Sequence, residues 1–517
     1  MRIETYDTTL RDGAQAEGIS FSLEDKISIV EQLAQLGVDY IEGGNPASNP
    51  RDRQLYAHFA QHPLSGACLV AFGSTRKVGI APEEDEGLLA LAECGAQVVA
   101  IFGKAWDFHV TDVLRTTLEE NLAMIRDSIA FLHARGKTVF FDAEHYFDGY
   151  AENPQYALAV LNAAAEAGAQ KLVLCDTNGG TLCRALGDSV YEAAQLYPGR
   201  IGIHCHNDAG MAVALSIEAV LRGAVQVQGT INGLGERCGN ANLCSIIPTL
   251  SLKLGYETLP DLSGLYSAAH TIAAIANVAI DEHQPYVGAS AFAHKGGMHI
   301  DGVNKNPKTF EHIEPQAVGN ARRTLLSDLS GRSAILLRIA RVAPDLTRES
   351  AQIAHIYDEL KRMEFEGYQF ESAESTFELF VLRTLGRFTP HYTVKDFRIL
   401  SEQPLSDTSA FAMINVQVDG REEVTADYGD GPVNALDKAL KKALGVFYPQ
   451  IAELALTDFK VRVVDTGSGT ASRVRVHIQS SFRHQRFFTV GVSSNVLQAS
   501  LQALCDSIDA MLEFGST

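Results

Sequence analysis

Short runs of aliphatic and β-branched residues alternate, between residues 1 and 260, with longer stretches whose hydrophobic positions recur at helical spacing. Several helical stretches end in glycine, as in LAQLG, LAECG and AAEAG, which is typical of a helix C-terminus. The runs predict strands at Ile3–Thr8, Val38–Gly43, Ala67–Phe72, Gln97–Phe102, Lys137–Asp142, Lys171–Cys175, Ile201–His206 and Val225–Thr230. The pattern is therefore a repeated strand–helix unit.

Eight strand–helix units over about 250 residues predict an α/β fold, the (β/α)8 TIM barrel, whose active site lies at the carboxyl ends of the strands. An open, doubly wound sheet is the alternative, but no G-x-G-x-x-G motif follows the first predicted strand. We assign residues 1–265 to a catalytic barrel domain.

The strand–helix repeat stops after residue 265. Residues 266–388 contain the Gly- and His-rich segment AFAHKGGMHIDGVNKNP and then helical sequence, which predicts a mainly helical linker or lid. Residues 389–517 carry a strand–strand–helix pattern twice, first from AFAMINVQVDG to PVNALDKALKKAL and again from SRVRVHIQSS to NVLQASLQALCDSIDAML. This ββα duplication predicts a C-terminal α+β domain for regulation or dimerisation.

The charge and cysteine content exclude several classes of partner. The 43 basic and 63 acidic residues give a net charge of −20 without a basic patch, so we expect neither nucleic acid nor a membrane surface as a partner. No apolar run is long enough to cross a bilayer, and MRIETYDTTL lacks the apolar core of a signal peptide. The eight cysteines contain no C-x-x-C pair. These features favour a cytoplasmic protein.

A candidate metal site lies at the predicted strand ends. His204 and His206 are two residues apart on a predicted strand, so both imidazoles face the same side. Asp12 follows the first strand and lies at the same rim. A catalytic Mn²⁺, Mg²⁺ or Zn²⁺ ion suits a site of two imidazoles, one carboxylate and one more oxygen ligand, in which some coordination positions stay open for substrate. The H-x-H pattern alone leaves a second interpretation open, in which the two histidines are ordinary residues of a strand and bind no metal ion.

The motifs DTTLRDG, HCHND and GERCGNANL resemble those of the acyl-CoA-condensing and -cleaving metalloenzymes of the isopropylmalate synthase and homocitrate synthase family. The similarity covers essentially the whole chain. IEGGNPASNPRD, AFGSTR, DAEHYFDGY and LCDTNGGTL are most similar to members that use pyruvate. The resemblance implies a homodimer that condenses acetyl-CoA with pyruvate in isoleucine biosynthesis. The alternatives are a member that accepts 2-oxoisovalerate, a hydroxymethylglutaryl-type lyase, and a non-catalytic amino-acid sensor.

Carried over residue by residue, the resemblance implies roles at the barrel rim. Its metal ligands are Asp12, His204, His206 and Asn240. Arg11 binds substrate and stabilises the alkoxide, Glu144 is catalytic, and Thr177 hydrogen-bonds the pyruvate carboxylate. For Glu144 a helix-capping role is the alternative. Asn45 stands where relatives carry other, often aromatic, residues, so we expect the wall of the oxo-acid pocket to differ there.

The resemblance also implies catalytic groups in the lid of a partner subunit. His299 in KGGMHIDG is the candidate base for the acetyl methyl group, with Asp301 orienting its imidazole and His294 as a weaker candidate. Phe310 stands where relatives often carry tyrosine, which puts acid catalysis from that position in doubt.

The resemblance places the enzyme in isoleucine biosynthesis, and this suggests isoleucine as an inhibitor. We expect isoleucine to bind the duplicated module, with backbone groups near Gly467, Thr470, Gly491 and Ser494 holding its amino and carboxyl groups. The alternative is that the duplication serves only dimerisation.

Overall fold

The computed structural model describes residues 1–295, 297–324, 336, 338–347, 349–401, 410–464, 472–483 and 485–515. The chain divides into two compact units. The first contains Met1–Ala293 and Glu311–Arg323, and the second contains His294–Phe310 and Thr324–Thr517. Residues 266–388, expected to form one linker, therefore contribute to both units.

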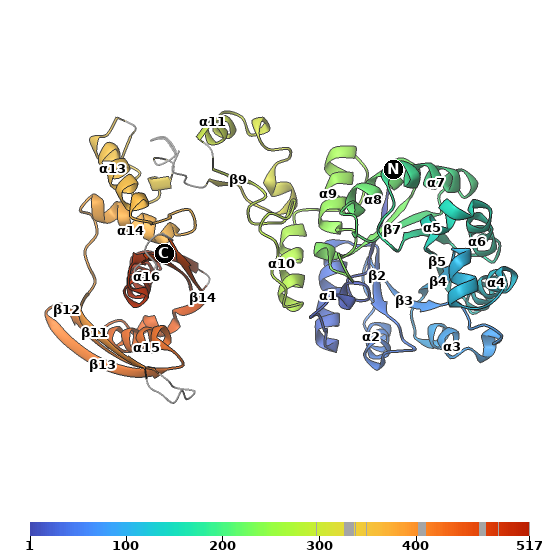
Figure 1. Cartoon of the computed structure of the whole chain (residues 1–517), viewed down its shortest axis with the longest axis horizontal. Helices are drawn as coiled ribbons and strands as arrows, with labels where there is room; N and C mark the ends of the chain where they lie inside the picture. Colours follow the sequence, from blue (N-terminus) through green and yellow to red (C-terminus); the bar gives the residue numbers. More distant parts are fainter. Residues whose placement is uncertain are drawn as a thin grey trace. The chain divides into compact units, whose positions relative to one another are not determined.

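The first unit is a closed parallel barrel in which eight strands follow one another in sequence order, as predicted (Figure 1). The strands are β1 (Glu4–Asp7), β2 (Tyr40–Gly44), β3 (Cys68–Ser74), β4 (Val98–Lys104), β5 (Thr138–Glu144), β6 (Lys171–Asp176), β7 (Ile201–Cys205) and β8 (Gln226–Gly229). Each predicted strand overlaps the observed strand in the same place. The sheet closes because β1 pairs with β8.

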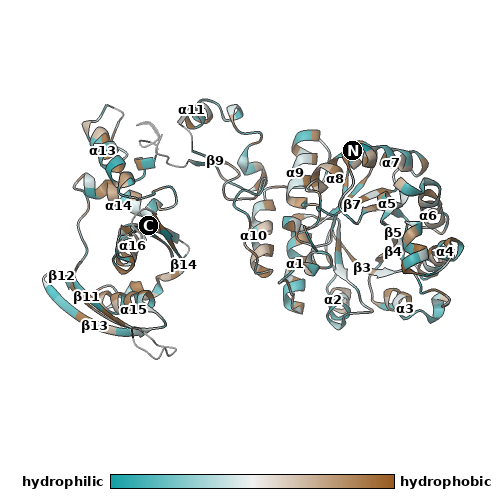
Figure 2. Ribbon diagram, in the orientation of Figure 1, coloured by the Kyte–Doolittle hydropathy of each residue, from teal (hydrophilic) through white to brown (hydrophobic). Residues whose placement is uncertain are grey.

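Helices surround the barrel and connect its strands. They are α1 (Leu23–Leu36), α2 (Pro50–Gln61), α3 (Glu86–Glu93), α4 (Leu118–Ala134), α5 (Tyr146–Glu152), α6 (Pro154–Glu166), α7 (Cys183–Leu196), α8 (Ala212–Leu221), α9 (Leu243–Leu254) and α10 (Leu265–Ile275). They carry both hydrophobic and hydrophilic residues (Figure 2), as expected of helices with one face on the barrel and the other on solvent.

The glycines that the sequence placed after helices have left-handed backbone conformations. Gly37, Gly95 and Gly168 have φ angles of 92°, 90° and 101°. At Gly37 a side chain would also collide with Pro260, since a Cβ atom would lie 2.5 Å from its Cδ. These positions require glycine because other residues rarely adopt such angles.

The barrel interior has an apolar half and a polar half. Tyr6, Val70, Val98, Ala100 and Phe140 form one buried cluster, against which Tyr40 and Phe72 pack. The polar side chains come mainly from β1, β6, β7 and β8. They include Glu4, Lys171, His204, Gln226 and Gln228.

The second unit contains helices and two three-stranded antiparallel sheets (Figure 1). Its helices include α11 (Gly297–Lys305), α13 (Ala351–Phe365), α14 (Glu374–Thr384), α15 (Pro432–Gly445) and α16 (Val496–Phe514). The sheets are β11 (Thr393–Ser401), β12 (Ala410–Val418) and β13 (Arg421–Gly429), and β14 (Ala455–Val463), β15 (Val474–Phe482) and β16 (Gln485–Ser493). Two short strands, β9 (Ala293–His294) and β10 (Arg323–Thr324), pair with each other.

Each half of the duplication is βββα, so the predicted ββα pattern needs one more strand per copy. The missed strands, β11 and β14, are edge strands with mostly exposed or half-buried residues. Their hydrophobic signal is weak because neither strand has a fully buried face. The helices α15 and α16 contribute to one shared apolar core with β12, β15 and β16. In the part of the chain that the structure describes, no helix is both long and apolar enough to span a bilayer.

Candidate active site

Asp12, His204 and His206 meet at the carboxyl ends of β1 and β7, as the sequence predicted. Each offers a ligand atom, and these atoms lie within 4.8 Å of one another. Nε2 of His204 lies 3.3 Å from Oδ2 of Asp12. All three residues are buried, with 3%, 5% and 7% of their surface exposed. Among the described residues, this is the sole group of three or more side chains from His, Cys, Asp and Glu arranged to hold a metal ion.

Asn240 completes this cluster from the loop after β8. Its Nδ2 atom lies 3.3 Å from Oδ2 of Asp12 and 3.4 Å from Nε2 of His204, and Asn240 forms a backbone bridge with His206. The Gly235 backbone approaches so closely that a Cβ atom there would lie 2.0 Å from Oδ1 of Asn240. Rotating the amide by 180° would place Oδ1 beside the two ligand atoms.

The donor set fits a divalent metal ion. Oδ1 of Asn240 and Nδ1 of His206 are buried without a hydrogen-bond partner among the described residues. Such atoms are costly to bury unless something satisfies them. Two imidazoles, one carboxylate and one amide oxygen form a mixed nitrogen and oxygen set of the kind that catalytic Zn²⁺ and Mn²⁺ sites use.

Arg11 is held beside the cluster by two carboxylates. Its Nη1 atom hydrogen-bonds Asp12 and its Nε atom hydrogen-bonds Glu42. The guanidinium carbon lies 3.9 Å from the centre of the Phe72 ring. Burial alone would lower the pKa of Arg11, but the two carboxylates raise it, so the guanidinium remains charged.

Burial and neighbouring charges also shift the pKa values of acidic and imidazole groups. Burial raises the pKa of Asp142 to about 8, with a further contribution from the Glu42 charge. Burial lowers the pKa of His206 to about 4, assisted by His204. Burial favours the neutral form of Asp12, but Arg11 and the two histidines outweigh it and lower the pKa of that carboxyl. The site therefore offers a neutral imidazole at His206 and an ionised carboxylate at Asp12, the forms that bind a metal ion.

Glu144 and Thr177 both lie at the rim. Glu144, at the end of β5, forms an ion pair with Lys104 at the end of β4. The Thr177 hydroxyl oxygen accepts a hydrogen bond of 2.9 Å from the backbone N–H of His145, and its carbonyl accepts one of 2.9 Å from Arg237. A hydroxyl group can accept one hydrogen bond and donate another, so Thr177 can also donate its hydrogen to a ligand.

A cavity of about 290 Å³ opens at this rim. Its lining includes Arg11, Asp12, Phe72, Phe102, Asp142, Glu144, Cys175, Thr177, His204 and His206. The Phe72 and Phe102 rings stack with their centres 5.6 Å apart and form an aromatic wall. Asn45 does not line this cavity but a neighbouring one, where its Oδ1 atom accepts hydrogen bonds from Ala47 and Ser48.

His299 and Asp301 belong to helix α11 of the second unit. The His299 ring stacks on Phe310, with ring centres 4.0 Å apart. Asp301 accepts a hydrogen bond of 2.6 Å from Lys305, one helical turn away, rather than orienting His299 as expected. Residues two apart on a helix point in different directions, whereas residues four apart are neighbours.

The residues expected to hold an inhibitor are only partly described. Gly467 and Thr470 lie outside the described residues. Gly491 in β16 packs so tightly on α16 that a Cβ atom would lie 2.0 Å from the Ala499 carbonyl oxygen. Ser494 is exposed between β16 and α16.

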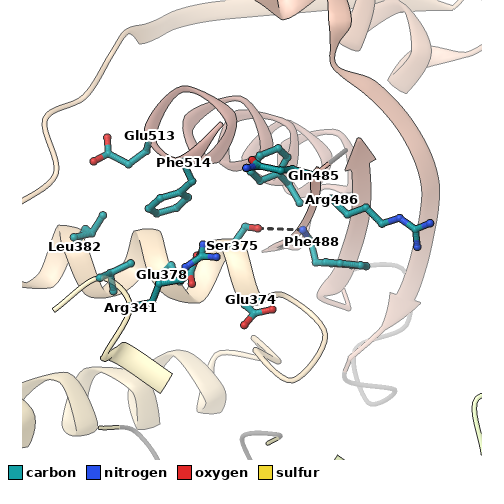
Figure 3. Close-up of a pocket in the computed structure, with 12 residues that line it drawn as sticks. Arg341, Glu374, Ser375, Glu378, Leu382, Gln485, Arg486, Phe488, Glu513 and Phe514 are labelled. Carbon is teal, nitrogen blue, oxygen red and sulfur yellow. Dashed lines mark hydrogen bonds and ion pairs between the residues drawn. The ribbon is translucent and has the colours of Figure 1, made fainter. Parts of the chain in front are cut away.

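The second unit has a cavity of its own, of about 520 Å³, between α14, α16 and the start of β16 (Figure 3). There Ser375 lies beside the backbone N–H of Phe488, which donates to its hydroxyl over 3.2 Å (Figure 3). Glu378 pairs with Arg341 on the same wall. Among the described residues, none that lines this cavity is a histidine or a cysteine, so we assign the catalytic chemistry to the barrel.

Models of known families match successive parts of the chain. The HMGL-like model covers residues 2–272, the homocitrate synthase post-HMGL domain-like model covers 286–367, and the LeuA allosteric (dimerisation) domain model covers 371–512. Together with the barrel and its carboxylate–histidine cluster, they define a metal-dependent acyl-CoA enzyme of the HMGL-like class.

Comparison with individual relatives identifies the family within this class. An (R)-citramalate synthase from Geobacter sulfurreducens is 49% identical over 99% of this chain and 97% of its own, and one from Aquifex aeolicus is 48% identical over 98% and 97%. A 2-isopropylmalate synthase from Pyrococcus furiosus is 29% identical over 98% and 99%. The chain belongs to the (R)-citramalate synthase family.

Among solved structures, a hydroxymethylglutaryl-CoA lyase from Pseudomonas aeruginosa is 22% identical, covers 54% of this chain and 94% of its own, and gives a TM-score of 0.47.

Sequence reasoning missed several site residues. Glu42, Phe72, Phe102, Asp142 and Gln228 all lie on strands that were predicted, facing the barrel interior. The signal that reveals them is the period of two along a strand, which places Gln226 and Gln228, for example, on the same face.

Proposed function

We propose that this chain condenses acetyl-CoA with pyruvate and water to give (R)-citramalate and CoA. The observation that carries this proposal is that five relatives named (R)-citramalate synthase are 41–49% identical over at least 97% of the chain. Two 2-isopropylmalate synthases are only 29% identical over similar lengths, which disfavours 2-oxoisovalerate as the substrate.

Asp12, His204, His206 and Asn240 would hold the metal ion, either Mn²⁺, Mg²⁺ or Zn²⁺. Their close approach, their burial and the unpartnered Asn240 and His206 atoms support this assignment. A bound divalent ion supplies Lewis-acid polarisation of a keto group.

Three residues at the rim bind and orient pyruvate in this proposal. The Thr177 hydroxyl donates a hydrogen bond to the pyruvate carboxylate. The Arg11 guanidinium, fixed by Asp12 and Glu42, lies where it stabilises the alkoxide that forms from the keto oxygen. Glu144, which pairs with Lys104 at the same rim, takes part in proton transfer.

Citramalate formation requires a base, and we propose His299 of a partner subunit. Its imidazole accepts a proton from the acetyl methyl group, and the resulting carbanion forms a carbon–carbon bond to the keto carbon of pyruvate. Protonation of the alkoxide gives citramalyl-CoA. Water then cleaves the thioester, which releases citramalate and CoA.

The aromatic wall explains a preference for pyruvate over larger oxo acids. Phe72 and Phe102 limit the cavity beside the metal-ligand cluster, and Arg11 rests on the Phe72 ring. In this proposal the methyl group of pyruvate lies beside the two rings, where a branched side chain would need more space.

Thiol release from acetyl-CoA tests the reaction directly. The purified enzyme is supplied with pyruvate, 2-oxobutyrate, 2-oxoisovalerate and glyoxylate in separate assays, and the products are identified by mass spectrometry. We expect the highest kcat/KM with pyruvate and a product of the mass of citramalate. A higher value with 2-oxoisovalerate would establish isopropylmalate synthase activity instead, and no CoA release with any oxo acid would favour a sensor.

We further propose a cytoplasmic homodimer that isoleucine inhibits through residues 389–517, with residues 266–388 as linker and lid and residues 1–265 as the catalytic part. The match of residues 371–512 to a domain described as allosteric and dimerising supports this regulation. All eight cysteines are free, in keeping with a reducing compartment.

Titration of isoleucine, leucine and valine against the initial rate tests the inhibitor. A truncated chain for comparison should end before residue 371, because Thr376 of α14 accepts a hydrogen bond of 3.0 Å from Val490 of β16. We expect isoleucine to inhibit the full chain alone. Equal inhibition of both chains, or of neither, would leave dimerisation as the role of the module.

A further inference from the structure

The polar half of the barrel interior contains a continuous row of hydrogen bonds that ends at the metal-ligand cluster. At the far end, Nζ of Lys171 lies 3.0 Å from Oε1 of Glu4. Nε2 of Gln226 donates to Oε2 of Glu4 over 3.2 Å, and Nε2 of Gln228 donates to Oε1 of Gln226 over 3.4 Å. Finally, Oε1 of Gln228 lies 3.0 Å from Nδ1 of His204.

The strands make room for this row. Gln226 and Gln228 lie two apart on β8, so both point into the barrel, and both are fully buried. On the neighbouring strand β7, Gly202 leaves space beside Gln226, since a Cβ atom there would lie 3.2 Å from Oε1 of Gln226. The same atom would lie 3.1 Å from Val173. A larger residue at position 202 would therefore push against the row.

The charged end of the row fixes the direction of every hydrogen bond. A lysine ammonium only donates, and a carboxylate only accepts. Glu4 therefore turns the amide nitrogen of Gln226 toward itself, which leaves the oxygen of Gln226 to face Gln228. In turn, Gln228 directs its nitrogen to Gln226 and its oxygen to His204. An oxygen acceptor beside Nδ1 requires that Nδ1 of His204 carries the hydrogen.

The two contacts of Gln228 support this orientation of its amide. Its oxygen lies 3.0 Å from Nδ1 of His204, and its nitrogen lies 3.4 Å from the oxygen of Gln226. Reversing the amide would place its oxygen against the oxygen of Gln226 and would break that donor contact inside a buried site, where unpaired polar groups are costly.

We propose that Gln228, held by the row from Lys171 and Glu4, fixes His204 as the tautomer with hydrogen on Nδ1 and so directs the Nε2 lone pair toward the metal ion. Nε2 is the atom that lies 3.3 Å from Oδ2 of Asp12. Gln228 is a positioning residue, because it acts through His204. The inference rests on the metal site of the proposed function. It concerns one histidine only, since Nδ1 of His206 has no hydrogen-bond partner in the described part of the chain.

Nitrogen NMR of metal-free protein labelled with ¹⁵N-histidine reads the tautomer without any activity measurement. His204 is assigned by its loss in His204→Gln. In the unaltered protein we expect hydrogen on Nδ1 of His204, and in Gln228→Leu a mixture of both tautomers. The double variant Glu4→Met/Lys171→Met, which removes the charged end, should shift the same signals in the same direction. An unchanged Nδ1–H tautomer in both variants would overturn the proposal.

Mn²⁺ titration of metal-free protein by calorimetry gives the second test. Gln228→Leu should weaken Mn²⁺ binding by about 10–100-fold, the usual effect of removing the partner of a ligating histidine. Gln228→Glu keeps an acceptor oxygen and should bind more tightly than Gln228→Leu. Gln97→Leu is the matched control, since the Gln97 side chain bonds the exposed Gly136 carbonyl and should leave Mn²⁺ affinity unchanged.

Titrating Asp12→Asn in parallel distinguishes an error in the metal site from an error in the positioning role of Gln228. If Asp12→Asn binds Mn²⁺ as tightly as the unaltered protein, the metal site itself is misassigned. If Asp12→Asn loses Mn²⁺ while Gln228→Leu binds it normally, the metal site stands and the positioning role of Gln228 is refuted.

Discussion

Arg11 donates a hydrogen bond from Nε to the fully buried carboxylate of Glu42, which joins the end of β1 to β2. The other Glu42 oxygen accepts from the Tyr6 hydroxyl, so both oxygens are engaged. Because Nη1 of Arg11 reaches Asp12 at the same time, the guanidinium has one position beside the metal-ligand cluster.

Replacing Glu42 should therefore reduce catalysis through Arg11. Arg11→Gln removes the charge that faces the alkoxide and should lower kcat by about 10²–10³-fold, as loss of an oxyanion-stabilising group does. Glu42→Gln should lower kcat by a smaller factor with little change in the KM for pyruvate. Steady-state kinetics measures both. Glu120→Gln is the control, because it breaks the ion pair with Arg76 elsewhere in the barrel domain; an equal loss of kcat there would contradict a specific role for Glu42.

Removing the metal ion should abolish the reaction without unfolding the protein. Asp12→Asn and His206→Ala should lose the bound ion and nearly all condensation, and a chelator should have the same effect on the unaltered enzyme. Metal content by mass spectrometry, CoA release and circular dichroism measure the three quantities. Full turnover in rigorously metal-free protein would rule out the proposed mechanism.

Widening the aromatic wall should relax the choice of oxo acid. Phe102→Ala enlarges the cavity while leaving Arg11 on the Phe72 ring. We expect the preference for pyruvate over 2-oxobutyrate to fall about tenfold, the discrimination that one methylene group commonly provides. The ratio of kcat/KM values measures it. Phe108→Ala, at a ring that is 47% exposed, is the control and should leave the ratio as it is.

His299 should matter for proton removal, and Asp301 should not. His299→Ala should suppress deuterium exchange at the methyl group of acetyl-CoA far more than it weakens pyruvate binding. Asp301→Ala should change exchange little, because Asp301 pairs with Lys305. If both variants suppress exchange equally, Asp301 does orient the base in the working complex, and if neither does, the base is another group.

His477 should make the second unit sensitive to acid. Burial in β15 lowers the pKa of His477 from 6.5 to about 4, with Arg475 and Lys460 contributing. The unfolded chain then binds more protons than the folded one between these pH values, so stability falls as the pH drops from about 6.5 toward 4. His477→Gln should show a smaller fall in Tm between pH 7 and pH 5 than the unaltered protein. An identical fall would show that other groups govern this range.

The sequence by itself determined the barrel, the duplication and the residues of the carboxylate–histidine cluster. Eight hydrophobic runs, several of them preceded by a helix that ends at glycine, admit few arrangements, because parallel strands need crossover helices and those connections are right-handed. The period of two along β7 put His204 and His206 on one face, and the closure of the barrel brings Asp12 beside them. The strands β11 and β14 were not predicted from the sequence, because neither strand has a buried face.

Tertiary structure alone decided which groups support that site. Glu42 and Gln228 look like ordinary polar residues in the sequence, since a strand pattern gives the face of a side chain and not its partner across a closed barrel. Their contacts with Arg11 and His204 join residues that are 31 and 24 positions apart in the chain. Asp301 shows the converse, because proximity in sequence suggested a bond to His299, whereas the helix turns it to Lys305. The spacing of residues along the sequence fixes the direction in which their side chains point within one helix or strand. A hydrogen bond between two elements depends on distances that only the folded chain sets.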